Sequence, residues 1–309
     1  MARLPDFVIA GSQRGGSSFL ASVLREHPGV FMPQAEIPYF QDPDFQETPR
    51  AEFEALFHDA RPDQVVGIKR PNYLAFPFVA ERIKALMPEA KIIAILRNPI
   101  ERAISAYFLN VMHGFVPAVP IERGLRAILD GRWTKAYPRS SEIIEFGYYG
   151  RQLRHYLTLF EADKFLVLAQ ERVHAEPAEK TIRRLYEFVG VDPNYEARTR
   201  GRSTTIYSLP RLRLQRIANR FKYTYSTPRT RLYWNDPSRL GRVVLRQIER
   251  VDFKLFHGDP GAKPELSEPL RAELRELYRA DVGELRSLGL VEELPWADFA
   301  PSAVHQVGV

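Results

Sequence analysis

A short run of glycine, serine and arginine residues near the N-terminus has the composition of an anion-binding loop. Residues 11–18 read Gly-Ser-Gln-Arg-Gly-Gly-Ser-Ser and follow an apolar run, residues 7–10, that is typical of a buried parallel strand. Apolar residues then recur at helical spacing, and Ser17 or Ser18 is expected to cap that helix. Free backbone N–H groups and the helix dipole at such a loop both favour a bound anion, so the run predicts a phosphate-type site.

The spacing of this run nearly matches the loop that binds nucleoside triphosphates. Gly11 and Gly16 are correctly spaced for the pattern G-x-x-x-x-G-K-[ST], and Ser18 occupies the hydroxyl position. Ser17 replaces the lysine of that pattern, and the basic residue of the loop is Arg14. The sequence therefore keeps an anion site but lacks the lysine that contacts a γ-phosphate.

Charged residues follow three other predicted strands. Glu36, Lys69 and Arg97 each come shortly after an apolar run, and the carboxyl ends of parallel strands meet at one edge of a sheet. Arg97 follows the most apolar strand, where a nucleoside triphosphatase would carry a carboxylate for Mg²⁺. The cations Arg14, Lys69 and Arg97 together predict a site for a nucleotide that carries phosphates at two separate places and needs no metal.

The alternation of predicted strands and helices indicates a parallel sheet covered by helices on both faces. We expect strands at 7–10, 30–32, 65–68, 91–96 and 165–168, and helices near 52–57, 78–87, 100–112, 121–129, 149–160 and 178–189. Beyond residue 200 the alternation stops. The sequence there predicts helices at 209–221, 243–256 and 269–288, with a turn-rich segment at 222–241.

Composition limits the classes of function. The chain of 309 residues contains no cysteine, which excludes disulfides and thiolate metal sites. No signal peptide or membrane-length apolar run is visible, so we expect a cytoplasmic protein. Residues 200–250 contain 13 lysines and arginines against two acids. This block indicates either an anionic partner or a solvated basic face.

Two motifs resemble those of the sulfotransferase family. The first is Arg-Gly-Gly-Ser-Ser at residues 14–18, and the second is Arg-Asn-Pro-Ile-Glu-Arg-Ala-Ile-Ser-Ala-Tyr at residues 97–107. They match the family's 5′-phosphosulfate loop and 3′-phosphate motif, and the resemblance to the carbohydrate (heparan-sulfate-type) branch covers about residues 6–190. Within the second motif, Glu101 and Arg102 are expected to be charges of an exposed helix face.

The resemblance implies 3′-phosphoadenosine 5′-phosphosulfate (PAPS) as the sulfuryl donor. Arg97 and Ser105 would bind its 3′-phosphate. Arg202 is a weaker candidate, because the segment around it only partly resembles the loop that closes over the 3′-phosphate in the family. The residues implied for the 5′-phosphosulfate are Arg14, Gly15, Gly16, Ser17 and Ser18.

The resemblance also implies catalytic roles. Lys69 matches the lysine that stabilises charge on the bridging oxygen as the sulfuryl group leaves, and Arg14 assists it at the phosphosulfate. Glu36 matches the general base of the glycan branch, although Pro38 replaces a histidine that follows the base there. His113, at the end of a predicted helix, is an alternative base, and the two alternatives stay open here.

These observations predict an α/β, P-loop-NTPase-like three-layer fold with a helical C-terminal portion. We expect a single sulfotransferase domain over residues 1–309, with the PAPS site in 6–200 and a basic portion in 201–309. The predicted activity is metal-independent, in-line sulfuryl transfer from PAPS to a hydroxyl or amine of a small-molecule, glycan or lipid acceptor. The alternatives are a P-loop kinase or NTPase, or a non-catalytic binder of polyanions or anionic membrane through residues 200–250. No nucleic-acid partner is expected, and the oligomeric state is open.

Overall fold

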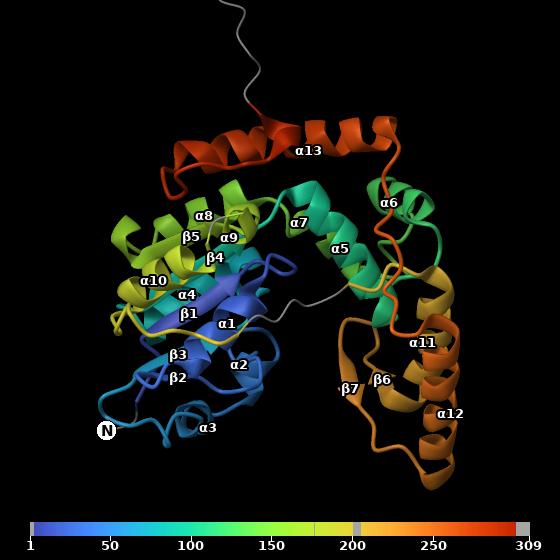
Figure 1. The fold of residues 1–309 in the computed structure, drawn as a ribbon, viewed down its shortest axis with the longest axis horizontal. Helices are drawn as coiled ribbons and strands as arrows, with labels where there is room; N and C mark the ends of the chain where they lie inside the picture. The colour runs from blue at the N-terminus through green and yellow to red at the C-terminus, as the bar shows by residue number, and fades with distance from the viewer. Residues whose placement is uncertain (1–2, 176, 200–204, 301–309) are drawn as a thin grey trace, which may run out of the picture. The chain divides into compact units, whose positions relative to one another are not determined.

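The structure is a computed structural model that describes residues 3–175, 177–199 and 205–300, and these form two compact units (Figure 1). The first unit contains residues 3–99, 148–199 and 275–300 of the described chain, and the second contains 100–147 and 205–274. Both units therefore draw residues from each side of position 200. The single domain with a division at that position stays a prediction.

Five parallel strands form the sheet of the first unit, in the order β2-β3-β1-β4-β5. Their bounds are β1 Phe7–Gly11, β2 Val30–Phe31, β3 Val65–Lys69, β4 Lys91–Leu96 and β5 Phe165–Ala169. Ile9 of β1 lies opposite Lys69 on one side and Ile93 on the other. Because β3 and β4 flank β1, the strand order reverses there, and ligands of open α/β sheets bind at the carboxyl edge beside such a reversal.

Both faces of this sheet are buried. One face forms a core cluster with helices α1 (Ser17–Glu26), α9 (Gln170–Ala175) and α10 (Ala178–Val189). The residues that alternate with that face, such as Val8, Ala94 and Val167, are also buried. Helices α4 (Pro77–Leu86) and α8 (Tyr149–Leu157) pack against each other outside the cluster. This burial explains why the strands read as continuous apolar runs.

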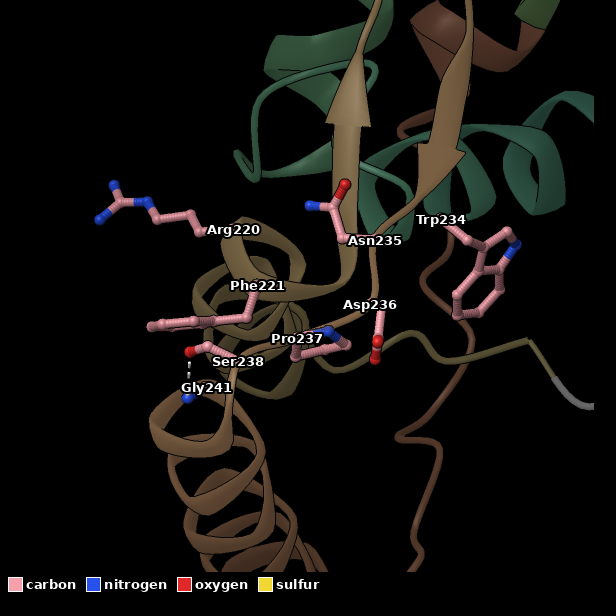
Figure 2. Close-up of a pocket in the computed structure, with 8 residues that line it drawn as sticks. All are labelled: Arg220, Phe221, Trp234, Asn235, Asp236, Pro237, Ser238 and Gly241. Atoms are coloured by element: carbon pink, nitrogen blue, oxygen red, sulfur yellow. Dashed lines mark hydrogen bonds between the residues drawn. The ribbon is translucent and has the colours of Figure 1, made fainter.

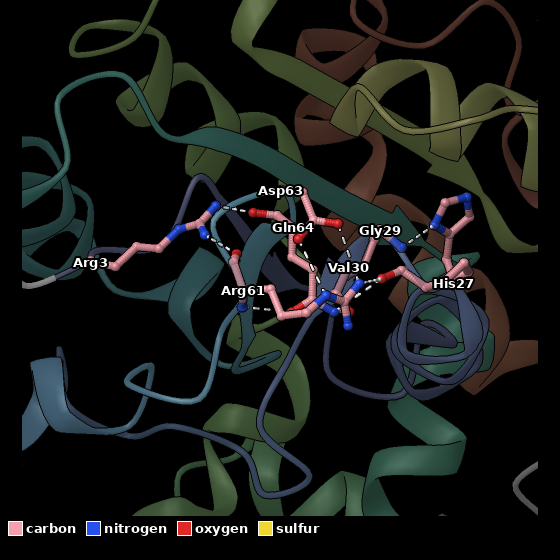
Figure 3. Close-up of polar contacts among 8 residues, drawn as sticks. Arg3, His27, Gly29, Val30, Arg61, Asp63 and Gln64 are labelled. Atoms are coloured by element: carbon pink, nitrogen blue, oxygen red, sulfur yellow. Dashed lines mark hydrogen bonds and ion pairs between the residues drawn. The ribbon is translucent and has the colours of Figure 1, made fainter.

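Side chains fasten the amino ends of β1, β2 and β3, at the end of the sheet opposite to the loops that follow the strands. Arg3 donates to the carbonyls of Arg61 and Gln64, as Figure 3 shows. The side-chain amide of Gln64 donates to the backbone carbonyls of Pro28 at 3.0 Å and Val30 at 3.3 Å. These contacts hold the short edge strand β2, which contributes only two residues to the ladder.

The first unit also contains several shorter elements and most of the last helix. They are α2 (Asp44–Glu47), α3 (Arg50–Ala55), the 3₁₀ turns η1 (Tyr73–Ala75), η3 (Ala162–Lys164) and η4 (Ala297–Phe299), and α13 (Glu268–Ser287), which begins in the second unit.

The second unit is mainly helical. Its elements are α5 (Pro99–Met112, whose first residue belongs to the first unit), α6 (Ile121–Leu129), η2 (Pro138–Ser140), α7 (Glu142–Glu145), α11 (Leu209–Lys222) and α12 (Arg239–Phe256). Strands β6 (Tyr223–Tyr225) and β7 (Leu232–Trp234) form an antiparallel hairpin between α11 and α12. The hairpin lies in the segment for which the sequence predicted only turns.

The predicted fold class is confirmed. A central parallel sheet flanked by helices is the P-loop-NTPase-like three-layer arrangement, and the C-terminal portion is helical as expected. No helix in the described part of the chain is long and apolar enough to cross a membrane.

Candidate active site

The loop between β1 and α1 is fastened to the neighbouring strand β4. The backbone N–H and the hydroxyl of Ser12 both donate to the carbonyl of Ile95, each at 2.9 Å. A Cβ atom on Gly15 would lie 2.2 Å from that same carbonyl oxygen, so only glycine allows this approach. Arg14 and Gly16 have positive φ angles of 67° and 110°. Alternating left-handed residues of this kind turn successive N–H groups toward a common point, as in other anion-binding loops.

Helix α1 begins without a side-chain cap. Its N-cap residue is Gly16, no side chain accepts a hydrogen bond there, and no acid lies in the first turn. The expectation that Ser17 or Ser18 caps the helix is therefore wrong, because both serines already lie inside it. With neither a side-chain cap nor an acid in the first turn, the positive end of the helix dipole can attract an external anion.

Lys69 connects this loop to Glu36. Its side chain is only 7% exposed, and its Nζ lies 2.9 Å from Ser18 Oγ and 3.1 Å from Glu36 Oε1. The second carboxylate oxygen of Glu36 accepts a hydrogen bond from Arg70 at 3.1 Å. Residues from the ends of β1 and β3 and from the segment after β2 therefore meet at the carboxyl edge of the sheet, as the sequence predicted.

The segment that carries Glu36 is held by contacts that the sequence did not reveal. The backbone N–H of Ile37 donates to the carbonyl of Lys69 at 3.1 Å. The hydroxyl of Tyr73 donates to the carbonyl of Ile37 and accepts from the N–H of Phe40 at 3.1 Å. Burial raises the pKa of Tyr73 well above its ordinary value, so its hydroxyl stays protonated and keeps donating. A lone tyrosine after Lys-Arg-Pro gives no sequence signal for this function.

The loop after β4 is organised by Glu171, which sequence analysis also missed. The carboxylate of Glu171 accepts from the backbone N–H of Asn98 and from Trp296 Nε1, both at 2.9 Å. The carbonyl of Arg97 accepts from the hydroxyl of Tyr149 at 3.0 Å. The backbone of Arg97 is thus fixed directly after the central strand β4, where a cation can face a ligand at the edge of the sheet.

The remaining predicted site residues lie in the second unit or outside the described residues. Ser105 is fully buried in α5, and its hydroxyl lies 3.0 Å from that of Thr205. His113 follows α5, and its carbonyl accepts from the hydroxyl of Tyr225 at 2.7 Å. Arg202 falls outside the described residues. The structure brings Ser18, Glu36 and Lys69 together, whereas the roles of Ser105, His113 and Arg202 stay predictions.

Two charges expected on an exposed helix face are instead largely or fully buried in the second unit. Arg102 is fully buried and donates to the carbonyl of Ile143. Glu101 is 18% exposed and forms ion pairs with Lys263 and, at 3.2 Å, with Arg271. That expectation is wrong because segments distant in sequence cover this part of α5, and helical spacing alone does not report such cover.

Cations dominate the polar groups gathered at this edge of the first unit. Arg14, Lys69, Arg70 and Arg97 follow the strands or lie in the anion loop, and Glu36 is the acid that contacts two of them. Among the described residues, no group of three or more histidine, cysteine, aspartate or glutamate side chains could hold a metal ion. The chemistry that this set favours is the binding of a phosphorylated or sulfated anion next to a carboxylate.

Comparisons with known proteins agree with this chemistry. Human heparan sulfate glucosamine 3-O-sulfotransferase 6 is 30% identical over 194 residues, which are 61% of this chain and 53% of that protein. Human bifunctional heparan sulfate N-deacetylase/N-sulfotransferase 2 is 29% identical over 201 residues, covering 62% of this chain and 22% of the other. The chain thus spans about half the length, or less, of these curated relatives.

A solved structure supports the fold. The sulfotransferase from Alicyclobacillus acidocaldarius superimposes with a TM-score of 0.65 at 22% identity, covering 93% of this chain and 96% of that one. The family model described as "Sulfotransferase domain" matches residues 4–214, which include the loop after β1, Glu36, Lys69 and the motif after β4. The chain therefore belongs to the sulfotransferase family.

Proposed function

We propose that this protein transfers a sulfuryl group from PAPS to a hydroxyl or amine of an acceptor molecule. The observation that carries the proposal is the position of Lys69, whose ammonium joins the Ser18 hydroxyl of the anion loop to the Glu36 carboxylate. A buried cation between an anion site and a carboxylate provides charge stabilisation and a proton acceptor within a few ångströms of each other.

The residues present fit a donor that carries two separate anionic groups. The 5′-phosphosulfate suits the loop of residues 14–18, since the backbone of Gly15 approaches β4 closely and α1 lacks a side-chain cap. The 3′-phosphate suits Arg97, which directly follows β4, and the resemblance to the family adds Ser105 as a prediction. PAPS supplies an activated sulfuryl group, and the proposed reaction needs no metal because cations of the protein face its charges.

The chain's own residues then have distinct tasks. Glu36 accepts the proton from the acceptor hydroxyl as the oxygen attacks, and the contacts to Lys69 and Arg70 hold its carboxylate in place. Lys69 donates a hydrogen bond to the bridging oxygen of the donor, on which negative charge develops as the sulfuryl group leaves, and Arg14 assists from the loop. We favour Glu36 over His113 as the base because Glu36 directly contacts Lys69.

The relatives inform the acceptor class. Those named above act on heparan sulfate, a glycan, which favours a glycan or a small molecule as the acceptor here. Pro38 replaces the histidine that the glycan branch carries after its base, so we expect an acceptor that differs from heparan sulfate at this position.

The first experiment compares thermal stabilisation by PAP, the desulfated donor, with that by ATP in the presence and absence of Mg²⁺. A ligand at a hundredfold excess over its Kd stabilises the folded state by about 2.7 kcal/mol. We expect a large shift with PAP that is lost in Arg14→Ala and Arg97→Ala and kept in Arg123→Ala, a control in an exposed part of α6. A shift with Mg-ATP alone would instead support a phosphoryl transferase, and no shift with either nucleotide would refute the proposed donor.

A further inference from the structure

Most of the exposed large apolar side chains of the second unit lie on α12, whereas α11 exposes Ile217. The basic block at residues 200–250 includes the arginines of α11, but three of them are engaged within the second unit. Arg211 forms a bidentate ion pair with Asp252 of α12 at 2.9 Å. Arg213 and Arg216 donate to backbone carbonyls of the segment before α6, at 3.3 and 3.1 Å.

Helix α12 presents an apolar strip that nothing in the described residues covers. Leu240 is 73% exposed, Val251 42% and Leu255 63%. At 100° per residue these three positions fall within about 60° of arc, so they form one continuous strip along the helix. Leu245, which is buried, and Asp252, which pairs with α11, lie about 60–140° around the helix from these three positions, so the strip borders the packed side of the helix and stays open on its outer edge.

A basic strip runs beside the apolar one. Arg239, Arg246 and Arg250 are exposed and fall within about 40° of arc on the helix. Within the described residues these three arginines form no ion pair. The nearest acid on this helix, Glu249, lies on the flank toward α11 and pairs with Lys222 at 3.7 Å.

Exposed aromatic side chains lie near both ends of the helix. Trp234 is 75% exposed. Phe253 is 69% exposed and borders the basic strip on the side away from the apolar strip. Trp234 lies next to the start of α12, since both it and Gly241 line one pocket, and Figure 2 shows its ring projecting away from Arg220. Tryptophan prefers the boundary between water and hydrocarbon, because its ring is apolar while its N–H can donate.

The geometry points to an interfacial membrane-binding surface made of α12 and Trp234, at the open end of the β6–β7 hairpin, with a bilayer of anionic lipids as its partner. Unpaired arginines beside an apolar strip suit a surface that is both negatively charged and hydrophobic. A second copy of this chain would bring arginine against arginine across a twofold axis. A soluble polyanion would contact the arginines but leave the leucines exposed to water. This surface is independent of the proposed sulfuryl transfer.

The first test is co-sedimentation of the full chain with phosphatidylcholine vesicles with and without about 30 mol% phosphatidylglycerol. We expect binding to the anionic vesicles only, together with a blue shift of tryptophan emission that Trp234→Phe abolishes. The double variant Leu240→Ser with Leu255→Ser should lose binding. A matched double variant at leucines exposed elsewhere, Leu56→Ser with Leu277→Ser, should keep it.

The charge contribution is tested separately with Arg246→Ser and Arg250→Ser combined. Because each basic residue near an anionic surface contributes about a factor of five, this variant should partition about 30-fold more weakly. The variant with Arg123→Ser and Arg183→Ser, which removes two exposed arginines elsewhere, should bind like the wild type.

Three outcomes would overturn the inference. The first is equal sedimentation with neutral and anionic vesicles. The second is retention on heparin without retention on vesicles, which would identify a soluble polyanion as the partner. The third is a dimer, measured by light scattering, that Leu240→Ser with Leu255→Ser converts to a monomer, which would identify a second copy of the chain.

Discussion

Removal of one hydroxyl group should loosen the segment that carries the proposed base. Tyr73→Phe keeps the buried ring but deletes the oxygen that donates to the carbonyl of Ile37 and accepts from the N–H of Phe40. Each lost hydrogen bond costs about 1 kcal/mol, and incomplete pairing of the buried carbonyl and N–H adds to this, so we expect a total of about 2–4 kcal/mol in the free energy of unfolding. Turnover should fall as well, because Glu36 directly precedes Ile37.

The chain offers a matched control for this variant. Tyr39 lies in the same segment and is also buried, with its ring stacked on Phe53 at 4.2 Å. Among the described residues its hydroxyl makes no hydrogen bond, so Tyr39→Phe should change the free energy of unfolding by about 0.5 kcal/mol or less. Urea unfolding of both variants measures the difference. If Tyr73→Phe were no more costly than Tyr39→Phe, the argument that this hydroxyl positions the segment would be refuted.

Three further predictions test the site and its support. Glu36→Gln should lower turnover by a factor of about 10²–10⁴ while it changes the unfolding free energy by about 1 kcal/mol or less, since the side chain is 38% exposed; steady-state kinetics that show full activity would exclude it as the base. Gly15→Ala should weaken PAP binding in calorimetry by about tenfold or more, because its Cβ would lie 2.2 Å from the carbonyl oxygen of Ile95, whereas Gly283→Ala, with open space around it, should bind normally. Burial raises the pKa of Asp281 above its ordinary value of 3.8, so this carboxyl group holds its proton more tightly in the folded state than in the unfolded state. The unfolding free energy of the wild type relative to Asp281→Asn should therefore be greatest below pH 3.8 and should fall as the pH rises through the raised pKa. If urea unfolding showed a difference between the two proteins that does not vary with pH, this prediction would be contradicted.

The sequence predicted the sheet of the first unit well because its strands are buried on both faces. Such strands appear as continuous apolar runs, and the charged residues that follow them must lie at the carboxyl edge. The contact between Lys69 and Glu36 follows from this topology alone, since β2 and β3 are neighbours in the sheet. The resemblance to the family then predicted which of these residues bind the donor.

The supporting contacts could not be predicted, because they depend on segments distant in sequence. Glu171 contacts Asn98, which lies 73 positions before it in the chain, and Trp296, which lies 125 positions after it. Arg102 is a charged residue within a predicted helix, and such residues are expected to be exposed, but its side chain is fully buried. The β6–β7 hairpin was missed because its strands have only three residues each and none of these residues is fully buried, so they show no apolar periodicity.

The contact between Glu171 and Trp296 has a consequence for engineering this enzyme class. The loop after β4 is completed by residues near the end of the described chain, since Trp296 is almost fully buried and Asp298 accepts from the side chain of Asn98 at 2.8 Å. The family match ends at residue 214, so these supports lie outside the part that two family members would be expected to share. A chimera that exchanged everything after residue 214 would also exchange Trp296 and Asp298, which support the loop after β4. An exchange of the C-terminal part should therefore keep the residues around Trp296 native.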